Sequence, residues 1–213
     1  MQDAIGTSPT VAPFDLRAEL IRFAERAFLI YISVLAIMRL APQVAEHPQI
    51  ALFLFSELIG VVLLLLQRRG EWTVKFYPIA VAVIGTTAAL AVMPEGQSLI
   101  SNGVSFVIIL TGGFIALSAK IFLGRSFGVI PANRGVKSIG VYRIVRHPMY
   151  LGYMIHHVGF LLVYFSVWNL AVYAVAWLTL YLRTVEEEKF LRQDAAYREY
   201  AGQVRYKLVP GII

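Results

Sequence analysis

The residues best suited to chemistry lie where a charged stretch meets an apolar one, in the segment Arg146-His147-Pro148-Met149-Tyr150-Leu151-Gly152. Proline favours the first position of a helix, so we expect a helix to begin at Pro148. The first N–H groups of a helix have no intrahelical partner and the helix dipole is positive there, which attracts carboxylates and phosphates. Arg146 and His147 add side-chain donors just before this start. The segment therefore predicts a binding site for an anionic group.

A second charged cluster, Arg183-Thr184-Val185-Glu186-Glu187-Glu188-Lys189, follows the apolar stretch. Arg183 and Glu187 are four residues apart and share one face of a helix. Carboxylates here could accept hydrogen bonds from ribose hydroxyls or an amino group while Arg146 binds an anionic end. Together the two clusters suit a zwitterionic, nucleoside-like cofactor. Two simpler interpretations stay open: the acids form a solvated, salt-bridged helix segment, and Arg146 only anchors the membrane topology.

The elements that must position these residues are membrane helices. Of 213 residues, 58% are hydrophobic and 15% are charged, and the mean hydropathy is +0.68, which predicts a polytopic membrane protein. The absence of cysteine excludes disulfides, thiolate metal sites, a cysteine nucleophile and lipidation on cysteine. The net charge of +6 is concentrated in short loops, where it indicates contact with anionic lipid headgroups rather than with nucleic acid.

Four apolar stretches precede the chemistry-bearing segments. Residues 1–15 are small and polar without a signal-peptide pattern, so we expect a mobile N-terminal tail. Within residues 16–119 we expect an interfacial lead-in over Leu16 to Arg26 and then membrane spans over Ala27 to Leu40, Ile50 to Gln67, Val74 to Met93 and Gly103 to Leu123.

The stretch from Tyr150 to Leu182 decides the topology. Its 33 residues carry no formal charge, and one straight helix of that length would measure about 50 Å against a hydrocarbon core of about 30 Å. A break at Ser166 to Asn169 would fold it into a helical hairpin. The fold class we predict is an all-α integral membrane protein of about six transmembrane helices, the last two forming this hairpin.

The charges of the loops predict the orientation. Most Arg and Lys residues fall on one side of these spans, whereas the other side contains Glu46 and Glu95, with Arg39 the only basic residue nearby. By the positive-inside rule both termini and the cofactor pocket are cytoplasmic, in a multi-pass protein of the inner membrane if the host is bacterial. The hairpin then brings the two charged clusters to the same face.

The ordered motifs carry a family resemblance. They are Gly140-Val141-Tyr142, the segment from Arg146 to Gly152, then Glu187-Glu188-Lys189-Phe190-Leu191, Tyr197, Tyr200, Arg205 and Val209-Pro210. This order resembles the isoprenylcysteine carboxyl methyltransferase family, with its G-x-Y, R-H-P-x-Y-x-G and E-E-x-x-L motifs. The resemblance covers roughly residues 120 to 210, so residues 120–213 are expected to form a methyltransferase-like catalytic region. Departures include Asp194-Ala195 in place of Phe-Gly and Val136-Lys137 in place of Leu-Val, and they concern the acceptor pocket most.

The resemblance implies a cytoplasmic S-adenosylmethionine site and a lipophilic substrate that enters laterally from the bilayer. The residues that inherit cofactor-binding roles are Tyr142, His147, Pro148, Tyr150, Gly152, Glu187 and Glu188. Arg146 and Arg205 match arginines that border the methyl-acceptor site and are the candidate catalytic residues. No metal is implied, and the oligomeric state is left open.

Methyl transfer needs an acceptor held in line with the S-methyl bond and shielded from water, so positioning supplies much of the rate. A carboxylate of an isoprenoid or prenylcysteine-like substrate is already ionised, and Arg205 would orient it. An amine or a thiol would need a base, for which Tyr197, Tyr200, Tyr206 or a glutamate are candidates.

Other interpretations remain at this stage. A membrane reductase of the sterol-reductase type would bind NADPH in a comparable pocket, and a third class is a non-enzymatic transport or assembly protein. His156 and His157 are adjacent and so point to different faces of a helix, which favours buried, hydrogen-bonded histidines over metal ligands. Glu57 interrupts an apolar stretch, and a helix-packing role is favoured over a substrate role.

Overall fold

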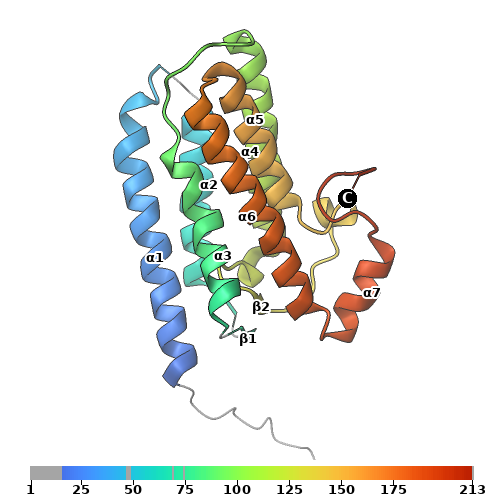
Figure 1. Ribbon diagram of the computed structural model, residues 1–213. Coiled ribbons are helices and arrows are strands. Elements are labelled where there is room, and N and C mark those ends of the chain that lie inside the picture. The colour runs from blue at the N-terminus through green and yellow to red at the C-terminus, as the bar shows by residue number, and fades with distance from the viewer. Residues whose placement is uncertain (1–15, 47–48, 69, 74, 213) are drawn as a thin grey trace, which may run out of the picture.

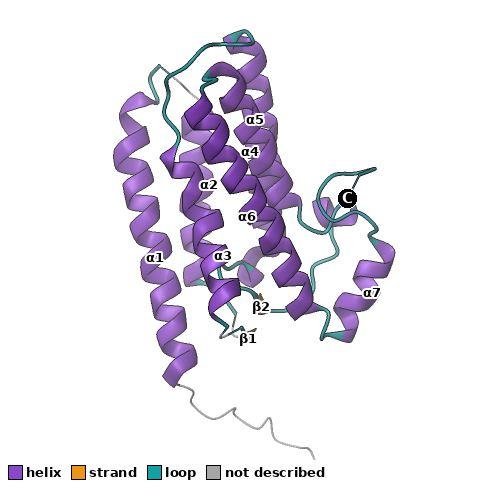
Figure 2. Ribbon diagram, in the orientation of Figure 1, coloured by secondary structure: helices purple, strands orange, loops and turns teal. Residues whose placement is uncertain are grey.

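Helices form nearly all of the regular structure in this computed structural model, which describes residues 16–46, 49–68, 70–73 and 75–212 (Figures 1 and 2). The α-helices are α1 (Leu16–Leu40), α2 (Gln49–Leu65), α3 (Phe76–Thr87), α4 (Asn102–Leu123), α5 (Pro148–Val163), α6 (Val167–Leu191) and α7 (Ala195–Gln203). Short 3-10 helices are η1 (Ala41–Gln43), η2 (Ala88–Ala91), η3 (Gly124–Ser126) and η4 (Gly140–Arg143). Strands β1 (Glu71–Trp72) and β2 (Ala132–Asn133) pair antiparallel. The predicted all-α class is confirmed, and the expectation for residues 1–15 lies outside the described residues.

One helix in the described part of the chain, Asn102–Ser126, is long and apolar enough to cross a membrane. Shorter apolar helices cover Ile50–Leu65, Phe76–Ala91 and Pro148–Val163. The lead-in and the first expected span form a single helix, α1, because no glycine or proline interrupts it before Pro42. Many large apolar side chains point outward, among them Phe76 at 85% and Val107 at 61% exposed. Such a surface suits a lipid environment, while the count of six spans stays a prediction.

The apolar stretch after Tyr150 is divided between two helices. The interruption lies at Tyr164 to Ser166, slightly before the expected position, and α6 already begins at Val167. Ser166 explains the shift, because its hydroxyl caps the new helix by accepting from Asn169 N at 3.1 Å. Asn169 is fully buried in α6, where its side chain bonds Met93 N, Met93 O and Tyr164 O. The polar residues thus mark a helix start rather than the middle of a turn.

The connections between helices gather at two ends of the bundle (Figure 1). We call one of them the far end. There, Gln97 forms an isolated antiparallel β-bridge with Phe165, and Trp168 Nε1 donates to Ala91 O at 2.9 Å. At the other, the loop end, Arg68 N donates to Arg125 O at 2.8 Å, and β1 pairs with β2. The basic connections therefore lie together at the loop end, in agreement with the charge pattern.

Helices α4 and α5 pack backbone to backbone where two glycines meet. A Cβ atom on Gly152 would lie 2.5 Å from Ala116 N and 2.7 Å from Gly112 O. No other residue type allows this separation, so glycine at these positions sets how α5 lies against α4. The loop-end start of α5 is thereby fixed relative to the bundle.

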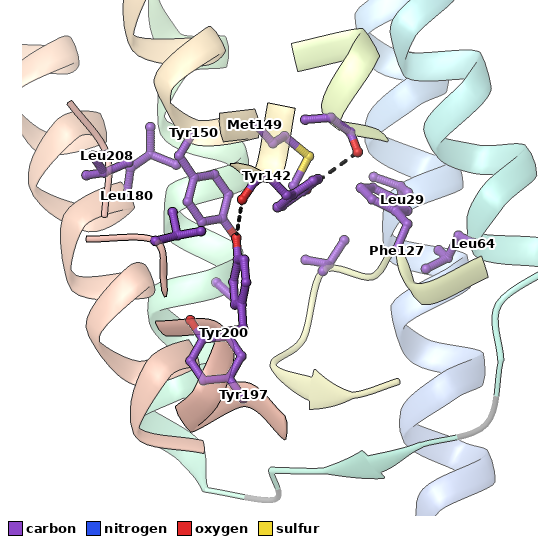
Figure 3. Close-up of a cluster of buried hydrophobic side chains, with 14 residues drawn as sticks. Leu29, Leu64, Phe127, Tyr142, Met149, Tyr150, Leu180, Tyr197, Tyr200 and Leu208 are labelled. Carbon is purple, nitrogen blue, oxygen red and sulfur yellow. Dashed lines mark hydrogen bonds between the residues drawn. The ribbon is translucent and has the colours of Figure 1, made fainter. Parts of the chain in front are cut away.

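A core of buried side chains underlies the loop end (Figure 3). Tyr142 and Tyr150 lie beside Tyr197 and Tyr200 of α7, and Leu29 of α1 belongs to the same cluster. This cluster joins helices from both halves of the chain to the C-terminal tail. It forms the support on which the polar residues of the same end are placed.

Glu57 has a packing partner, as its predicted role requires. Lys120 Nζ of α4 lies 2.7 Å from Glu57 Oε1 of α2 and also donates to Ser56 O at 3.0 Å. Elsewhere in the bundle, His157 stacks on Tyr173 with ring centroids 4.6 Å apart.

Candidate functional site

The two charged clusters predicted from the sequence meet at the loop end. His147 Nε2 lies 3.3 Å from Glu188 Oε1, and His147 Nδ1 lies 3.6 Å from Glu187 Oε2. Pro148 occupies the first turn of α5, so the helix begins where the sequence predicts. The chain reverses direction between α5 and α6 and so brings together residues that are about forty positions apart.

Two side chains hold Glu187 by hydrogen bonds. Its Oε1 accepts from Tyr150 OH at 2.5 Å and from Arg183 Nε at 3.0 Å. The predicted pairing of Arg183 with Glu187 on one helix face is thus confirmed. Arg183 is buried and donates through Nη2 to Val129 O at 2.6 Å, and its guanidinium lies 5.1 Å from the Tyr150 ring. The carboxylate is therefore fixed in direction by groups that are themselves fixed.

Glu188 is surrounded by cations. Its carboxylate lies 2.8 Å from Arg146 Nε, 3.3 Å from Arg192 Nη2 and 3.8 Å from Lys207 Nζ. Burial acts most strongly and opposes ionisation, but hydrogen bonds from His147 and Arg146 hold the pKa of Glu188 at about 2, below its usual 4.5. Glu188 stays ionised at neutral pH and joins α5, α6 and the tail.

The C-terminal tail closes over the start of α5. Arg146 N donates to Tyr206 O and His147 N to Lys207 O, both at 2.9 Å. Arg146 Nη1 donates to Val204 O and to Arg205 O at 2.8 Å each. The tail carbonyls therefore orient the Arg146 side chain and accept the backbone donors just before the helix.

A cavity of about 820 Å³, part of it open to solvent, lies beside these groups. The side chains and backbone that line it come from the loop at 123–137 (Leu123, Ser126, Gly128, Ile130, Pro131, Ala132, Arg134, Gly135, Val136, Lys137), from the segment 142–150 (Tyr142, Arg146, His147, Met149, Tyr150) and from Glu187, Leu191, Tyr197 and Tyr200. Charged, aromatic and apolar groups thus converge on one space.

Five of the nine predicted site residues line this cavity: Tyr142, Arg146, His147, Tyr150 and Glu187. The other four lie nearby in different roles. Pro148 is buried at the helix start, Gly152 sits at the crossing with α4, and Glu188 joins the cationic cluster. Arg205 is exposed, with its guanidinium 5.9 Å from the Tyr206 ring.

The tail tyrosines differ from the bases suggested for an amine or thiol acceptor. Burial raises the pKa of Tyr197 and of Tyr200 well above the ordinary value. Tyr200 OH donates to Tyr142 O at 2.8 Å. Both phenols are therefore protonated at neutral pH and act as donors or as packing groups rather than as bases.

The sequence did not indicate a role for Glu25, which lies behind the cavity loop. Glu25 of α1 is 3% exposed and accepts backbone N–H groups of the cavity loop. A signal existed, since Glu25 shares a helical face with Leu29, Ser33 and Ala36 at spacings of three and four. The interfacial lead-in predicted over Leu16 to Arg26 implies a solvated charge at this position, whereas Glu25 is buried.

Comparison with known proteins adds to this geometry. Residues 97–198 match the family described as "PEMT: Phospholipid methyltransferase". Over 106 residues the chain is 36% identical to Protein-S-isoprenylcysteine O-methyltransferase A of Arabidopsis thaliana, which covers 46% of this chain and 54% of that protein. Both matches are to methyltransferases.

The resemblance predicted from the motifs is thereby confirmed. The residues that match the family model span α4, α5, α6 and the first residues of α7, and they include all of the cavity lining except Tyr200. Helices α1 to α3 precede the matched residues. The chain spans about half the length of the curated relative that it matches.

Proposed function

We propose that this protein is an integral-membrane methyltransferase that transfers a methyl group from S-adenosylmethionine to a lipophilic acceptor. The observation that carries the proposal is the meeting of His147 with Glu187 and Glu188 beside the cavity. These residues belong to the two motifs of the region that matches the methyltransferase family, and the chain reversal places them together. Relatives named as methyltransferases count against the reductase and transport alternatives.

The cavity suits the donor in its chemical composition. S-adenosylmethionine supplies an electrophilic methyl group, and it carries a carboxylate, an ammonium group and a nucleoside. We infer that Glu187 receives the ammonium or the ribose hydroxyls, because it is a fixed carboxylate at the cavity wall. His147 and the first N–H groups of α5 suit the donor carboxylate. Tyr142 and Met149 add apolar surface that suits the adenine ring of the donor.

We infer that the acceptor is the carboxylate of an isoprenoid or prenylcysteine-like molecule that enters from the bilayer. Arg146 lines the cavity and is held rigidly by Glu188 and the tail, so it can orient an anion without further ordering. Arg205 is exposed on the adjacent tail and would meet the acceptor at the mouth. The buried, protonated tyrosines favour an acceptor that needs no base. The positively charged sulfonium group of S-adenosylmethionine would attract the same carboxylate of the acceptor.

Calorimetry with purified protein in lipid nanodiscs tests the donor. We expect S-adenosylmethionine to bind and NADPH to leave the protein unchanged. Binding of NADPH that excludes S-adenosylmethionine would replace this proposal by the reductase.

The proposed topology has both termini and the site on the cytoplasmic side. Because the chain contains no cysteine, single cysteines can report sidedness directly. We expect Lys137→Cys and Gly202→Cys to react with an impermeant maleimide from the cytoplasmic side, and Glu95→Cys to react from the opposite side. Labelling of Lys137→Cys and Gly202→Cys from opposite sides would contradict a shared site.

A further inference from the structure

Helix α1 inserts a carboxylate beneath the cavity loop. Glu25 Oε1 accepts from Val129 N at 2.5 Å and from Ile130 N at 2.8 Å. Its Oε2 lies 3.4 Å from Gln67 Nε2 and 3.7 Å from Arg134 Nη2. The carboxylate is thus surrounded by donors from α1's neighbours and from the loop.

The loop that Glu25 holds is the wall of the cavity. Gly128, Ile130 and Arg134 of this loop line the cavity directly. Gln67 Nε2 fixes the preceding turn by donating to Phe127 O at 2.9 Å. The loop backbone therefore receives its shape from side chains that lie outside the loop.

Val129 of this loop also connects Glu25 to Glu187. While Val129 N donates to Glu25, Val129 O accepts from Arg183 Nη2 at 2.6 Å, and Arg183 Nε lies 3.0 Å from Glu187 Oε1. Tyr150 OH donates to the same carboxylate oxygen. A continuous set of hydrogen bonds thus runs from α1 through one loop residue to the carboxylate assigned to the donor.

Burial makes a simple packing role for Glu25 unfavourable. An ionised carboxylate that leaves water loses several kcal/mol of solvation unless it is fully hydrogen bonded, and an apolar side chain would pack an α1 contact at lower cost. A carboxylate is useful here because one oxygen can accept two adjacent N–H groups and so fix a turn that has no helix or sheet to hold it.

We propose that Glu25 is a positioning residue of the methyl-donor site, acting through the loop at 127–134 and through Arg183 on Glu187. The inference rests on the proposed function. It extends the site to α1, which lies outside the residues that match the methyltransferase family. The N-terminal half is then part of the enzyme's donor site rather than only a membrane anchor.

The Glu25→Gln variant tests this assignment, with Glu46→Gln as the matched control. Glutamine keeps one acceptor oxygen but turns an NH₂ group toward the Arg134 and Gln67 donors. We expect the dissociation constant for S-adenosylmethionine to rise about tenfold or more, the scale set by losing a hydrogen bond to a charged group. We expect turnover at saturating donor to change less than about threefold, because the acceptor side is untouched. Glu46 is exposed at the far end, and its variant should match the wild type.

Each outcome decides something different. If the wild type binds no S-adenosylmethionine, the proposed function itself fails. If the wild type binds it and Glu25→Gln binds it equally well, only the role of Glu25 fails. Equal losses in affinity and in maximal turnover would indicate a general structural role and also overturn the assignment.

If Glu25→Gln does not fold, amide hydrogen exchange of the wild type tests whether Glu25 holds the cavity loop. We expect the Val129 and Ile130 amides to exchange slowly with deuterated solvent, and S-adenosylhomocysteine to slow them further. Rapid exchange that the ligand leaves unchanged would show that the carboxylate does not hold the loop in the way proposed.

Discussion

Arg146 Nε lies 2.8 Å from Glu188 Oε1, which joins a residue two positions before α5 to a residue near the end of α6. Both side chains are less than a tenth exposed. Removing one partner of a buried ion pair leaves the other charge uncompensated. The pair therefore couples the stability of the loop end to the geometry of the site.

Glu188→Gln should lower the free energy of unfolding by about 3 kcal/mol, the usual scale for breaking a buried pair from one side. Arg146, His147 and Lys207 would lose their common anion. Chemical unfolding in detergent measures the change. Glu199→Gln, an exposed change of the same kind on α7, should stay within about 0.5 kcal/mol of the wild type. An equal effect of the two substitutions would contradict the cationic cluster.

The same residue predicts acid sensitivity. Because the folded pKa of Glu188 is lowered from 4.5 to about 2, its contribution is fully present above about pH 4.5 and is lost as the pH falls through about 2. As the pH is lowered across this window, the unfolding temperature should fall more steeply for the wild type than for Glu188→Gln. Parallel curves for the two proteins would mean that Glu188 has an ordinary pKa.

Glu187 and Tyr150 should control donor affinity rather than stability alone. Glu187→Ala removes the fixed carboxylate at the cavity wall, and we expect donor binding to weaken at least about tenfold. Tyr150→Phe removes only the hydroxyl that orients Glu187, which predicts a loss of about 1 kcal/mol in binding. Calorimetry with S-adenosylmethionine measures both. The order of the two effects is the critical result, and a larger loss for Tyr150→Phe would be inconsistent with this arrangement.

Gly152 was expected to bind the cofactor, and its position predicts a different phenotype. Gly152→Ala places a methyl group against the α4 backbone at 2.5 Å, so we expect a stability loss of about 2 kcal/mol from overpacking. Gly202→Ala, with nothing within 4 Å of the added carbon, should be neutral or stabilising. Thermal unfolding of the two alanine variants compares them. If Gly152→Ala were as stable as the wild type but had lost donor affinity, the cofactor role would be favoured instead.

The sequence predicted most of what local chemistry determines. A proline at a helix start and the pairing of Arg183 with Glu187 follow from rules that act within a few residues, and both are present. The meeting of His147 with Glu187 followed once the long apolar stretch had to break. That prediction rests on length, because 33 uncharged residues in one straight helix would exceed the thickness of a bilayer core.

The rest depends on contacts between distant segments. The role of Glu25 needs the loop at 127–134 to pass beneath α1, and no local pattern specifies that path. The same holds for Gly152, whose neighbour across the crossing is Gly112. Arg205 was assigned from a motif, and its exposed position reflects the path of a tail whose backbone carbonyls, not side chains, contact Arg146.

Transfer of an isotopically labelled methyl group from S-adenosylmethionine into a lipid extract tests the central claim most directly. With purified protein in nanodiscs, we predict label in a lipophilic product that releases methanol on treatment with base, as a methyl ester does, and a strong reduction with Glu187→Ala. No label in any lipid fraction, although the wild-type protein is folded and the donor is present, would contradict the account.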